Sequence, residues 1–147
     1  MDYYLNIENV YQRLEKEYLE YGSLVIAFDF DNTVYDFHQK GLDFQDVIGL
    51  LRDLKQMGCY LIVFSANEDY SFIKEYCKKS TIPYDAINEN PPFYQSKSPK
   101  IYYNALLDDR AGLKTTYDCL RRLVGAYGAS IKTNVFADFN RLNQPAD

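Results

Sequence analysis

Residues 23–37 read SLVIAFDFDNTVYDF, an apolar run that ends in two aspartates separated by one residue. The run from Leu24 to Phe28 has the length of a strand and is rich in β-branched and aromatic side chains. This pattern is typical of a strand that is buried on both faces of a parallel sheet. Asp29 and Asp31 follow at once, and two carboxylates ~4 Å apart repel by ~4 kcal/mol at an effective dielectric constant of ~20. Either the run ends in a solvated turn, or another group compensates these charges.

The alternation of strand and helix patterns continues along the chain. Apolar residues at spacings of three and four predict helices, and short apolar runs predict further strands. The predicted helices cover 7–20, 44–57, 67–82 and 113–127, and the further strands cover 59–65, 84–88 and 101–107. The tail after Gly128 has no clear pattern, and residues 143–147 are expected to fray. Strands that alternate with helices predict a single α/β domain over residues 1–147, with a Rossmann-like, three-layer arrangement around a parallel sheet.

Composition limits the classes of function. The 147 residues carry a net charge of −5, so no global attraction draws the chain to nucleic acid or to an anionic membrane. Three scattered cysteines and a single histidine, His38, argue against a zinc site and against a Ser-His or Cys-His catalytic pair. Free thiols suit a reducing compartment, and no run approaches the ~18 apolar residues of a membrane span. A cytoplasmic protein that does not enter the membrane is therefore expected.

Polar side chains follow three of the predicted strands. Asp29 and Asp31 follow the first, Ser65 ends the second, and Asp108 and Asp109 follow the strand at 101–107. Taken alone, a D-x-D pair is often a solvated turn, and the second aspartate pair could simply cap a helix. Because the carboxyl ends of parallel strands meet at one edge of the sheet, we expect these groups to share one cleft. A hard cation such as Mg²⁺ would neutralise their carboxylates.

The residues DFDNT at 29–33 resemble the D-x-D-x-T signature of the haloacid dehalogenase superfamily, most of whose members are Mg²⁺-dependent phosphatases. VFSAN at 63–67 is similar to the second motif of that family, and LLDDRAG at 106–112 is similar to the fourth. Lys100 or Lys97 resembles the motif lysine that precedes the last strand. The resemblance covers most of the chain, and it implies a Rossmann-like domain, phosphomonoester hydrolase activity and Mg²⁺ as the cofactor.

The resemblance also implies a role for each matching residue. Asp29 would attack phosphorus to give an aspartyl phosphate, and Asp31 would move protons to the leaving alkoxide and from the hydrolytic water. Lys100, with Lys97 as its alternative, would lie between the nucleophile and the phosphate. Contacts to the substrate and within its loop would come from Asn32, Thr33 and Ser65. The metal would be bound by Asp29, Asp31, Asp108 and Asp109, and Asp31 could contribute its backbone carbonyl, which leaves its carboxylate free for proton transfer.

The spacing between the motifs leaves no room for an inserted cap domain. Thirty-one residues separate Thr33 from Ser65, and 31 separate Ser65 from Lys97. The predicted helices, strands and loops use up both intervals. We therefore expect an open site that accepts a small phosphorylated molecule or an exposed phosphate end of a larger substrate. The aromatic residues of segment 34–43 could contact this substrate or could only pack the segment onto the domain.

The residues are compatible with three functions. A Mg²⁺-dependent phosphomonoester hydrolase agrees with every motif. Arg110, in the sequence DDR, resembles some polynucleotide 3′-phosphatase domains, although the acidic net charge does not favour a nucleic-acid substrate. A phosphate- or partner-binding module without catalysis is the third possibility, and the complete set of matching residues argues against it.

Overall fold

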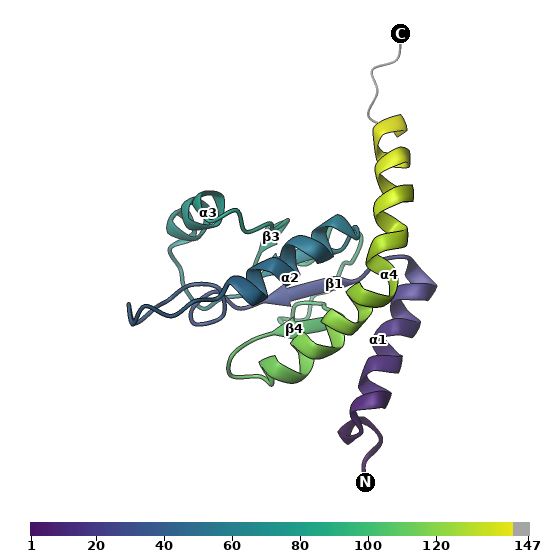
Figure 1. The fold of residues 1–147 in the computed structure, drawn as a ribbon. Coiled ribbons are helices and arrows are strands. Elements are labelled where there is room, and N and C mark those ends of the chain that lie inside the picture. Colours follow the sequence, from purple (N-terminus) through teal and green to yellow (C-terminus); the bar gives the residue numbers. More distant parts are fainter. Residues whose placement is uncertain (143–147) are drawn as a thin grey trace.

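A parallel sheet of four strands in the order β3-β2-β1-β4 organises the part of the chain that the structure describes (Figure 1). The structure is a computed structural model, which describes the backbone of residues 1–142 and the side chains of residues 1–129. The strands are β1 Val25–Phe28, β2 Tyr60–Val63, β3 Ala86–Ile87 and β4 Ala105–Leu107. The helices are the 3-10 helix η1 Tyr3–Leu5 and the α-helices α1 Ile7–Tyr21, α2 Gln45–Gln56, α3 Tyr70–Lys79 and α4 Leu113–Leu142. The predicted α/β fold with a parallel sheet is confirmed.

The strand β1 lies at the centre of this arrangement. It pairs in parallel with β2 on one side and with β4 on the other, so that Ile26 lies opposite both Leu61 and Ala105. All four of its residues are buried. The apolar run that opened the sequence therefore behaves as predicted, because a strand covered on both faces has no position at which a polar side chain would meet water.

The two faces of the sheet are covered by different kinds of structure. The helices pack on one face, where their apolar side chains form one core with alternate strand residues such as Ile26 and Leu61. On the other face, Val25 and Ile62 are covered mainly by residues 101–103, which belong to the connection between β3 and β4. The third layer of the domain is thus a segment of loop.

Topology explains this asymmetry. The chain moves outward from β1 to β2 to β3 through helices α2 and α3, and then returns across the sheet to reach the far side of β1. Right-handed crossovers that run in opposite directions lie on opposite faces of a sheet. The returning segment contains Pro91, Pro92 and Pro99, and prolines remove backbone donors that a helix would need.

The strand predicted at 101–107 is shorter in the structure and begins at Ala105. The backbone N–H of Tyr102 donates to the side-chain Oδ1 of Asn90 at 2.8 Å, in place of a neighbouring strand. Asn104 continues the pattern, because its backbone N–H donates to the carbonyl of Val25 at 2.7 Å and so guides the chain into β4. Residues 101–103 serve as a cover for the sheet, which apolar patterning alone does not distinguish from a strand.

The helix boundaries are close to the predicted ones, with two exceptions. The helix expected from Asn67 begins at Tyr70, because the side chain of Asp69 accepts a hydrogen bond from the N–H of Phe72 at 3.1 Å and caps the helix there. Helix α4 continues to Leu142, beyond the predicted end at 127, and the predicted fraying of residues 143–147 lies outside the described residues. No helix in the described part of the chain is long and apolar enough to span a membrane.

Candidate active site

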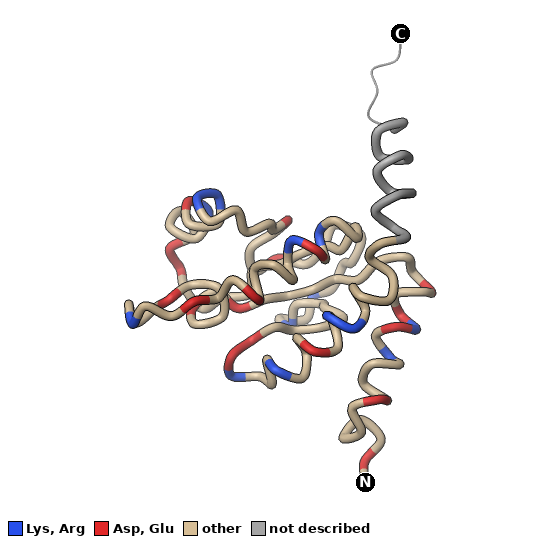
Figure 2. Tube along the Cα trace, viewed as in Figure 1, with Lys and Arg blue, Asp and Glu red and all other residues tan. Residues whose placement is uncertain are grey.

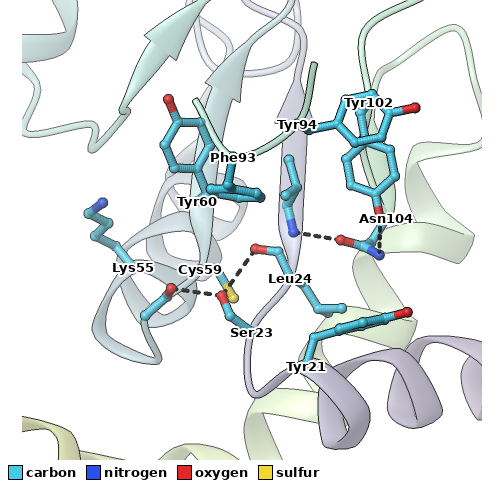
Figure 3. Close-up of a pocket in the computed structure, with 12 residues that line it drawn as sticks. Tyr21, Ser23, Leu24, Lys55, Cys59, Tyr60, Phe93, Tyr94, Tyr102 and Asn104 are labelled. Atoms are coloured by element: carbon cyan, nitrogen blue, oxygen red, sulfur yellow. Dashed lines mark hydrogen bonds between the residues drawn. The ribbon is translucent and has the colours of Figure 1, made fainter. Parts of the chain in front are cut away.

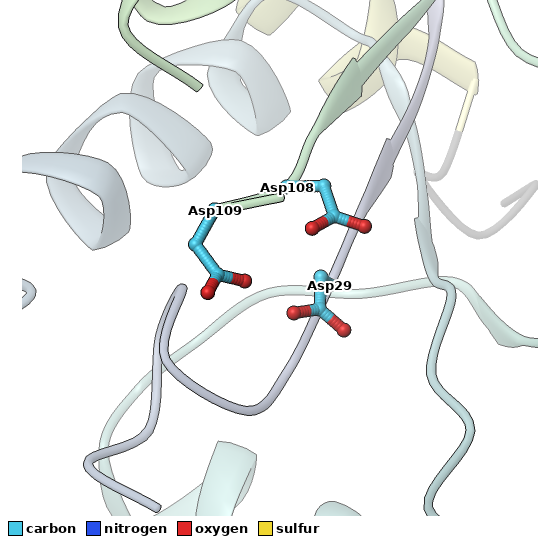
Figure 4. Close-up of side chains that lie close together, drawn as sticks. All are labelled: Asp29, Asp108 and Asp109. Atoms are coloured by element: carbon cyan, nitrogen blue, oxygen red, sulfur yellow. The ribbon is translucent and has the colours of Figure 1, made fainter. Parts of the chain in front are cut away.

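Three carboxylates meet at the carboxyl ends of β1 and β4. One oxygen atom from each of Asp29, Asp108 and Asp109 lies within 4.8 Å of the others (Figure 4). The backbone N–H of Asp29 donates to the carbonyl of Leu107 at 2.9 Å, so the sheet itself fixes the first residue of the loop. Figure 2 shows acidic positions along the connections that leave this edge of the sheet. The strand order makes it a topological switch point, where open α/β sheets commonly bind ligands.

These carboxylates line a cavity of about 600 Å³, a volume typical of sites for small molecules. Other charged and polar groups share its wall, together with two phenylalanines. Besides the three carboxylates, the lining includes Asp31, Asn32, Phe37, His38, Phe64, Ser65 and Arg110. The structure therefore brings together residues from all the strand ends that the sequence singled out.

Crowding and burial change the protonation of the aspartates. Burial, followed by the charge of Asp108, raises the pKa of Asp29 from its ordinary value of 3.8 to about 7. Burial, followed by the charge of Asp109, also raises the pKa of Asp31. Each shift reports that the ionised carboxylate is less stable in the folded protein than in water. A cation bound among these groups would relieve that cost.

Asp31 differs from the other aspartates in its surroundings. Its Oδ1 atom is buried and makes no hydrogen bond to any described residue. It also stands outside the group of three carboxylates that approach within 4.8 Å. A buried carboxylate oxygen without a partner is costly, and this cost adds to that of the crowded charges at the site.

Asn32 occupies the tight turn that follows Asp31. Its φ angle is +60°, a left-handed conformation that asparagine adopts more easily than most residues. Its backbone N–H donates to the carbonyl of Tyr35 at 2.7 Å, which closes the turn. Asn32 lines the cavity, as the prediction of a substrate-contacting residue requires.

Thr33, which is expected to steady the loop and to belong to the substrate-binding residues, does not line the cavity. Its side chain is fully buried, and its Oγ1 atom accepts a hydrogen bond from the backbone N–H of Asp109 at 3.1 Å. The same Oγ1 lies 3.4 Å from carboxylate oxygens of both Asp29 and Asp109. The hydroxyl thus joins the loop after β1 to the loop after β4, and Thr33 holds the site together from beneath.

Ser65 lines the cavity, and its backbone is held by Asn88. The Asn88 side chain accepts from the N–H of Ser65 at 2.9 Å and donates to its carbonyl at 2.8 Å. Asn88 has a φ angle of +54° and follows β3 directly. The sequence places Asn88 at the end of the strand predicted at 84–88, and nothing in the sequence links it to Ser65.

The structure does not bring either candidate lysine into this cavity. The Nζ atom of Lys100 lies 5.9 Å from the centroid of the Tyr103 ring, on the exposed connection that leads to β4. Lys97 is exposed on the same connection. The cation in the cavity wall is Arg110, whose backbone N–H donates to Oδ1 of Asp108 at 2.8 Å.

The aromatic residues after β1 divide into two groups. Tyr35 packs against Phe30, Phe72 and Tyr76, with ring centroids 4.8 to 5.2 Å away, and serves the core. Phe37 is instead exposed and lines the cavity. Tyr35 therefore packs the segment onto the domain, and Phe37 faces the cavity, where contact with a substrate stays a prediction.

A second cavity of about 550 Å³ lies at the opposite, amino-terminal ends of β1 and β2 (Figure 3). Its walls are largely aromatic and include Tyr60, Phe93 and Tyr102. The polar groups of Ser23 and Asn104 in this wall already make hydrogen bonds to the backbone. None of the motif residues reaches this cavity, so the candidate chemistry belongs to the carboxylate cavity.

Comparisons with known proteins support the fold alone. The sequence matches no protein-family model and has no significant match among curated proteins. Its structure is similar to that of a conserved protein from Bacteroides thetaiotaomicron, with a TM-score of 0.55 and 24% sequence identity. The similarity covers 68% of this chain and 91% of the other.

Proposed function

We propose that this chain is a metal-dependent phosphomonoester hydrolase of the kind that its motifs resemble in the haloacid dehalogenase superfamily. The main observation is the meeting of Asp29, Asp108 and Asp109 within 4.8 Å in a cavity that also contains Asp31 and Ser65. These side chains come from segments that are far apart in the sequence. Their order along the chain is that of the motifs in the haloacid dehalogenase superfamily. This gathering of carboxylates is costly without a positively charged ligand, and it suits a site that binds a cation with a phosphoryl group.

The chemistry of the donor set suits a hard divalent cation such as Mg²⁺, which prefers carboxylate oxygens. Asp29, Asp108 and Asp109 would hold it, and Asp31 would remain free because its carboxylate stands outside the group. When bound, such an ion would neutralise these carboxylates, favour the ionised form of Asp29 and polarise the phosphoryl oxygens.

The proposed reaction consists of two displacements at phosphorus. An oxygen of Asp29 attacks the phosphorus, the bond to the ester oxygen breaks, and Asp31 gives its proton to the leaving alkoxide. Water then attacks the aspartyl phosphate, Asp31 takes a proton from that water, and phosphate leaves as the Asp29 carboxylate is restored. Burial, followed by the charge of Asp109, raises the pKa of Asp31, which is the direction that favours proton donation to the leaving group.

The remaining polar groups of the cavity would bind the phosphoryl group. The Oγ atom of Ser65 accepts a hydrogen bond from the N–H of Asn67 at 3.1 Å, so its hydrogen can be donated to a phosphoryl oxygen. Arg110 would supply the positive charge that the resemblance assigns to a lysine. One guanidinium group can donate to two phosphate oxygens at once, and Arg110 already lines the cavity.

Turnover by the Asp29→Asn variant decides this proposal. The purified protein is assayed with Mg²⁺ against an aryl phosphate, nucleotides, sugar phosphates and a 3′-phosphorylated oligonucleotide. We expect turnover that EDTA abolishes and that Asp29→Asn lowers by ~10³-fold or more, as for loss of other covalent nucleophiles. Glu68→Gln is the matched control, because Glu68 is an exposed carboxylate near Ser65 that does not line the cavity.

Two results would contradict the proposed activity. Full turnover by Asp29→Asn would exclude this residue as the nucleophile. Binding of Mg²⁺ with no turnover across the whole panel would favour the non-catalytic binding module instead. A preference for the 3′-phosphorylated oligonucleotide over free nucleotides would keep the hydrolase and identify a polynucleotide end as its substrate.

A further inference from the structure

Two phenylalanines line the carboxylate cavity without belonging to the apolar core. Phe64 is 36% exposed and Phe37 is 52% exposed. Neither residue belongs to the clusters of buried side chains on either face of the described sheet. Phe28 and Phe30, which are close to them in the sequence or in the sheet, are fully buried. Two exposed rings on the wall of one polar cavity form an apolar surface that is suited to contact with a ligand.

The position of Phe64 is fixed by the sheet. Its backbone N–H donates to the carbonyl of Phe28 at 2.8 Å, which extends the pairing of β1 and β2 by one residue. The next residue, Ser65, is held on both its N–H and its carbonyl by Asn88. The Phe64 ring therefore projects from a rigid strand end, one residue from the hydroxyl that we assign to the phosphoryl group.

Phe37 lies on a turn that is also well fixed. The carboxylate of Asp36 accepts hydrogen bonds from the backbone N–H groups of residues 40, 41 and 42, at distances from 2.7 to 3.2 Å. The ring of Phe37 meets that of His38 edge to face, with centroids 5.0 Å apart, and both residues line the cavity. The turn thus presents a second aromatic surface to the same space.

We infer that the substrate is a phosphate ester whose leaving group carries a flat aromatic ring, and that Phe64 and Phe37 bind this ring. The inference rests on the proposed hydrolase function and adds its substrate class. Besides the carboxylates, and Ser65 and Arg110, which we assign to the phosphoryl group, the cavity wall offers Phe37, Phe64 and Ala66, with Asn32 and His38 as its polar groups. A polyhydroxylated leaving group would need several hydrogen-bonding side chains there, whereas a nucleobase or phenyl ring needs the apolar and π surfaces that are present.

A matched pair of substrates tests the inference. Adenosine 5′-monophosphate and ribose 5-phosphate have the same primary ester bond, and the nucleotide adds a base. We expect kcat/KM for the nucleotide to exceed that for the sugar phosphate by ~10-fold or more, mainly through KM, as stacking of one base commonly provides. Phe64→Leu keeps an apolar side chain but removes the ring, and it should reduce this ratio toward one.

A second pair distinguishes a nucleoside from a phenolic leaving group. Phosphotyrosine and phosphoserine differ in the intrinsic reactivity of their leaving groups. Because this reactivity does not depend on the enzyme, it cancels when the kcat/KM ratio of a variant is compared with that of the wild type. The quantities compared are kcat/KM for phosphotyrosine over phosphoserine (the phosphotyrosine ratio) and for the nucleotide over ribose 5-phosphate (the nucleotide ratio). If Phe64→Leu lowers the phosphotyrosine ratio more than the nucleotide ratio, the site is assigned to phenyl esters. Phe93→Leu is the control, since Phe93 is an exposed phenylalanine in the second cavity and should leave both ratios unchanged.

The inference is overturned if the wild type treats the nucleotide and the sugar phosphate alike and Phe64→Leu leaves the phosphotyrosine ratio unchanged. It is equally overturned if neither Phe64→Leu nor Phe37→Leu changes the ratio of kcat/KM values for either substrate pair. Phe37 lies in an exposed turn, so Phe37→Leu should fold even if Phe64→Leu does not. If no ester is turned over, the hydrolase proposal fails separately. Calorimetric titration with adenosine 5′-monophosphate and ribose 5-phosphate then decides, because a preference for the nucleotide that Phe64→Leu removes would still support the aromatic site.

Discussion

At the scale of single residues, Asp29 couples the site to the stability of the whole domain. Its pKa of about 7 in the folded protein, due to burial and then to Asp108, lies well above the ordinary value of 3.8. A carboxyl group with a raised pKa in the folded state stabilises the fold fully below its unfolded pKa, and this contribution is lost as the pH rises through the folded pKa. The wild type should therefore lose stability between about pH 4 and pH 7.

The Asp29→Asn variant tests this coupling, because an amide cannot ionise. Without divalent cations, the variant should be more stable than the wild type by ~1–2 kcal/mol at pH 8, a value reduced for solvent screening of a half-buried group, and no more stable at pH 4. Urea unfolding at both pH values measures the difference. Equal stability of the two proteins at pH 8 would show that Asp29 is not under electrostatic strain.

Asn88 is a positioning residue for Ser65, and its substitution should affect binding more than folding. Asn88→Gly keeps a residue that tolerates the φ angle of +54° but removes both hydrogen bonds to Ser65. We expect KM for a phosphate ester to rise by ~10-fold, because small displacements of a binding group are costly. Asn88→Asp retains the acceptor for the Ser65 N–H and should give a smaller rise.

Steady-state kinetics of the three proteins provide the measurement. Thermal unfolding of Asn88→Gly serves as the check that the fold is kept. An unchanged KM in a variant that has lost both hydrogen bonds would mean that Ser65 is held by the sheet alone.

At the scale of elements, an aromatic cluster attaches the turn after β1 to helix α3. Tyr35 contacts Phe30 on one side and Phe72 and Tyr76 on the other. Tyr35→Ala should cost ~3 kcal/mol in the free energy of unfolding, as expected for removal of a large aromatic side chain from a packed site. It should also increase protease cleavage within residues 36–42, because the turn would lose its anchor.

Tyr35→Phe is the matched variant for this prediction. It keeps the ring and removes only the hydroxyl, which accepts a hydrogen bond from the exposed side chain of Gln39. Urea unfolding and limited proteolysis should find it close to the wild type. If Tyr35→Ala behaved like Tyr35→Phe in both measurements, the cluster would not hold the turn.

The elements also show what the sequence could and could not predict. The buried strand from 25 to 28 and the carboxylates after it were predictable, because apolar patterning and strand ends are local properties. The inward orientation of Thr33, the clamp by Asn88 and the distance of Lys100 from the cavity depend on contacts between distant segments. The apolar run predicts Phe64 within a buried strand, whereas β2 ends at Val63 and Phe64 is exposed.

At the scale of the whole molecule, the two faces of the sheet should differ in how they open. Helices cover one face, whereas residues 101–103 cover the other, within a connection that has no helix or strand between β3 and β4. Backbone amides within β1 should exchange with solvent only through global unfolding, and those of residues 93–100 through local opening. Native-state hydrogen exchange at increasing denaturant concentration measures this. Loop amides that exchange as slowly as those of Ile26 and Ala27 would contradict the prediction.

The exposed ring of Phe64 has a consequence for spectroscopy. The sequence contains fifteen tyrosines and no tryptophan. A Phe64→Trp variant would therefore carry a single indole on the wall of the carboxylate cavity, with no other indole emission in the background. Because indole fluorescence responds to the polarity and ring contacts around it, filling of this cavity could be followed optically in the intact protein, without a labelled ligand or any chemical turnover.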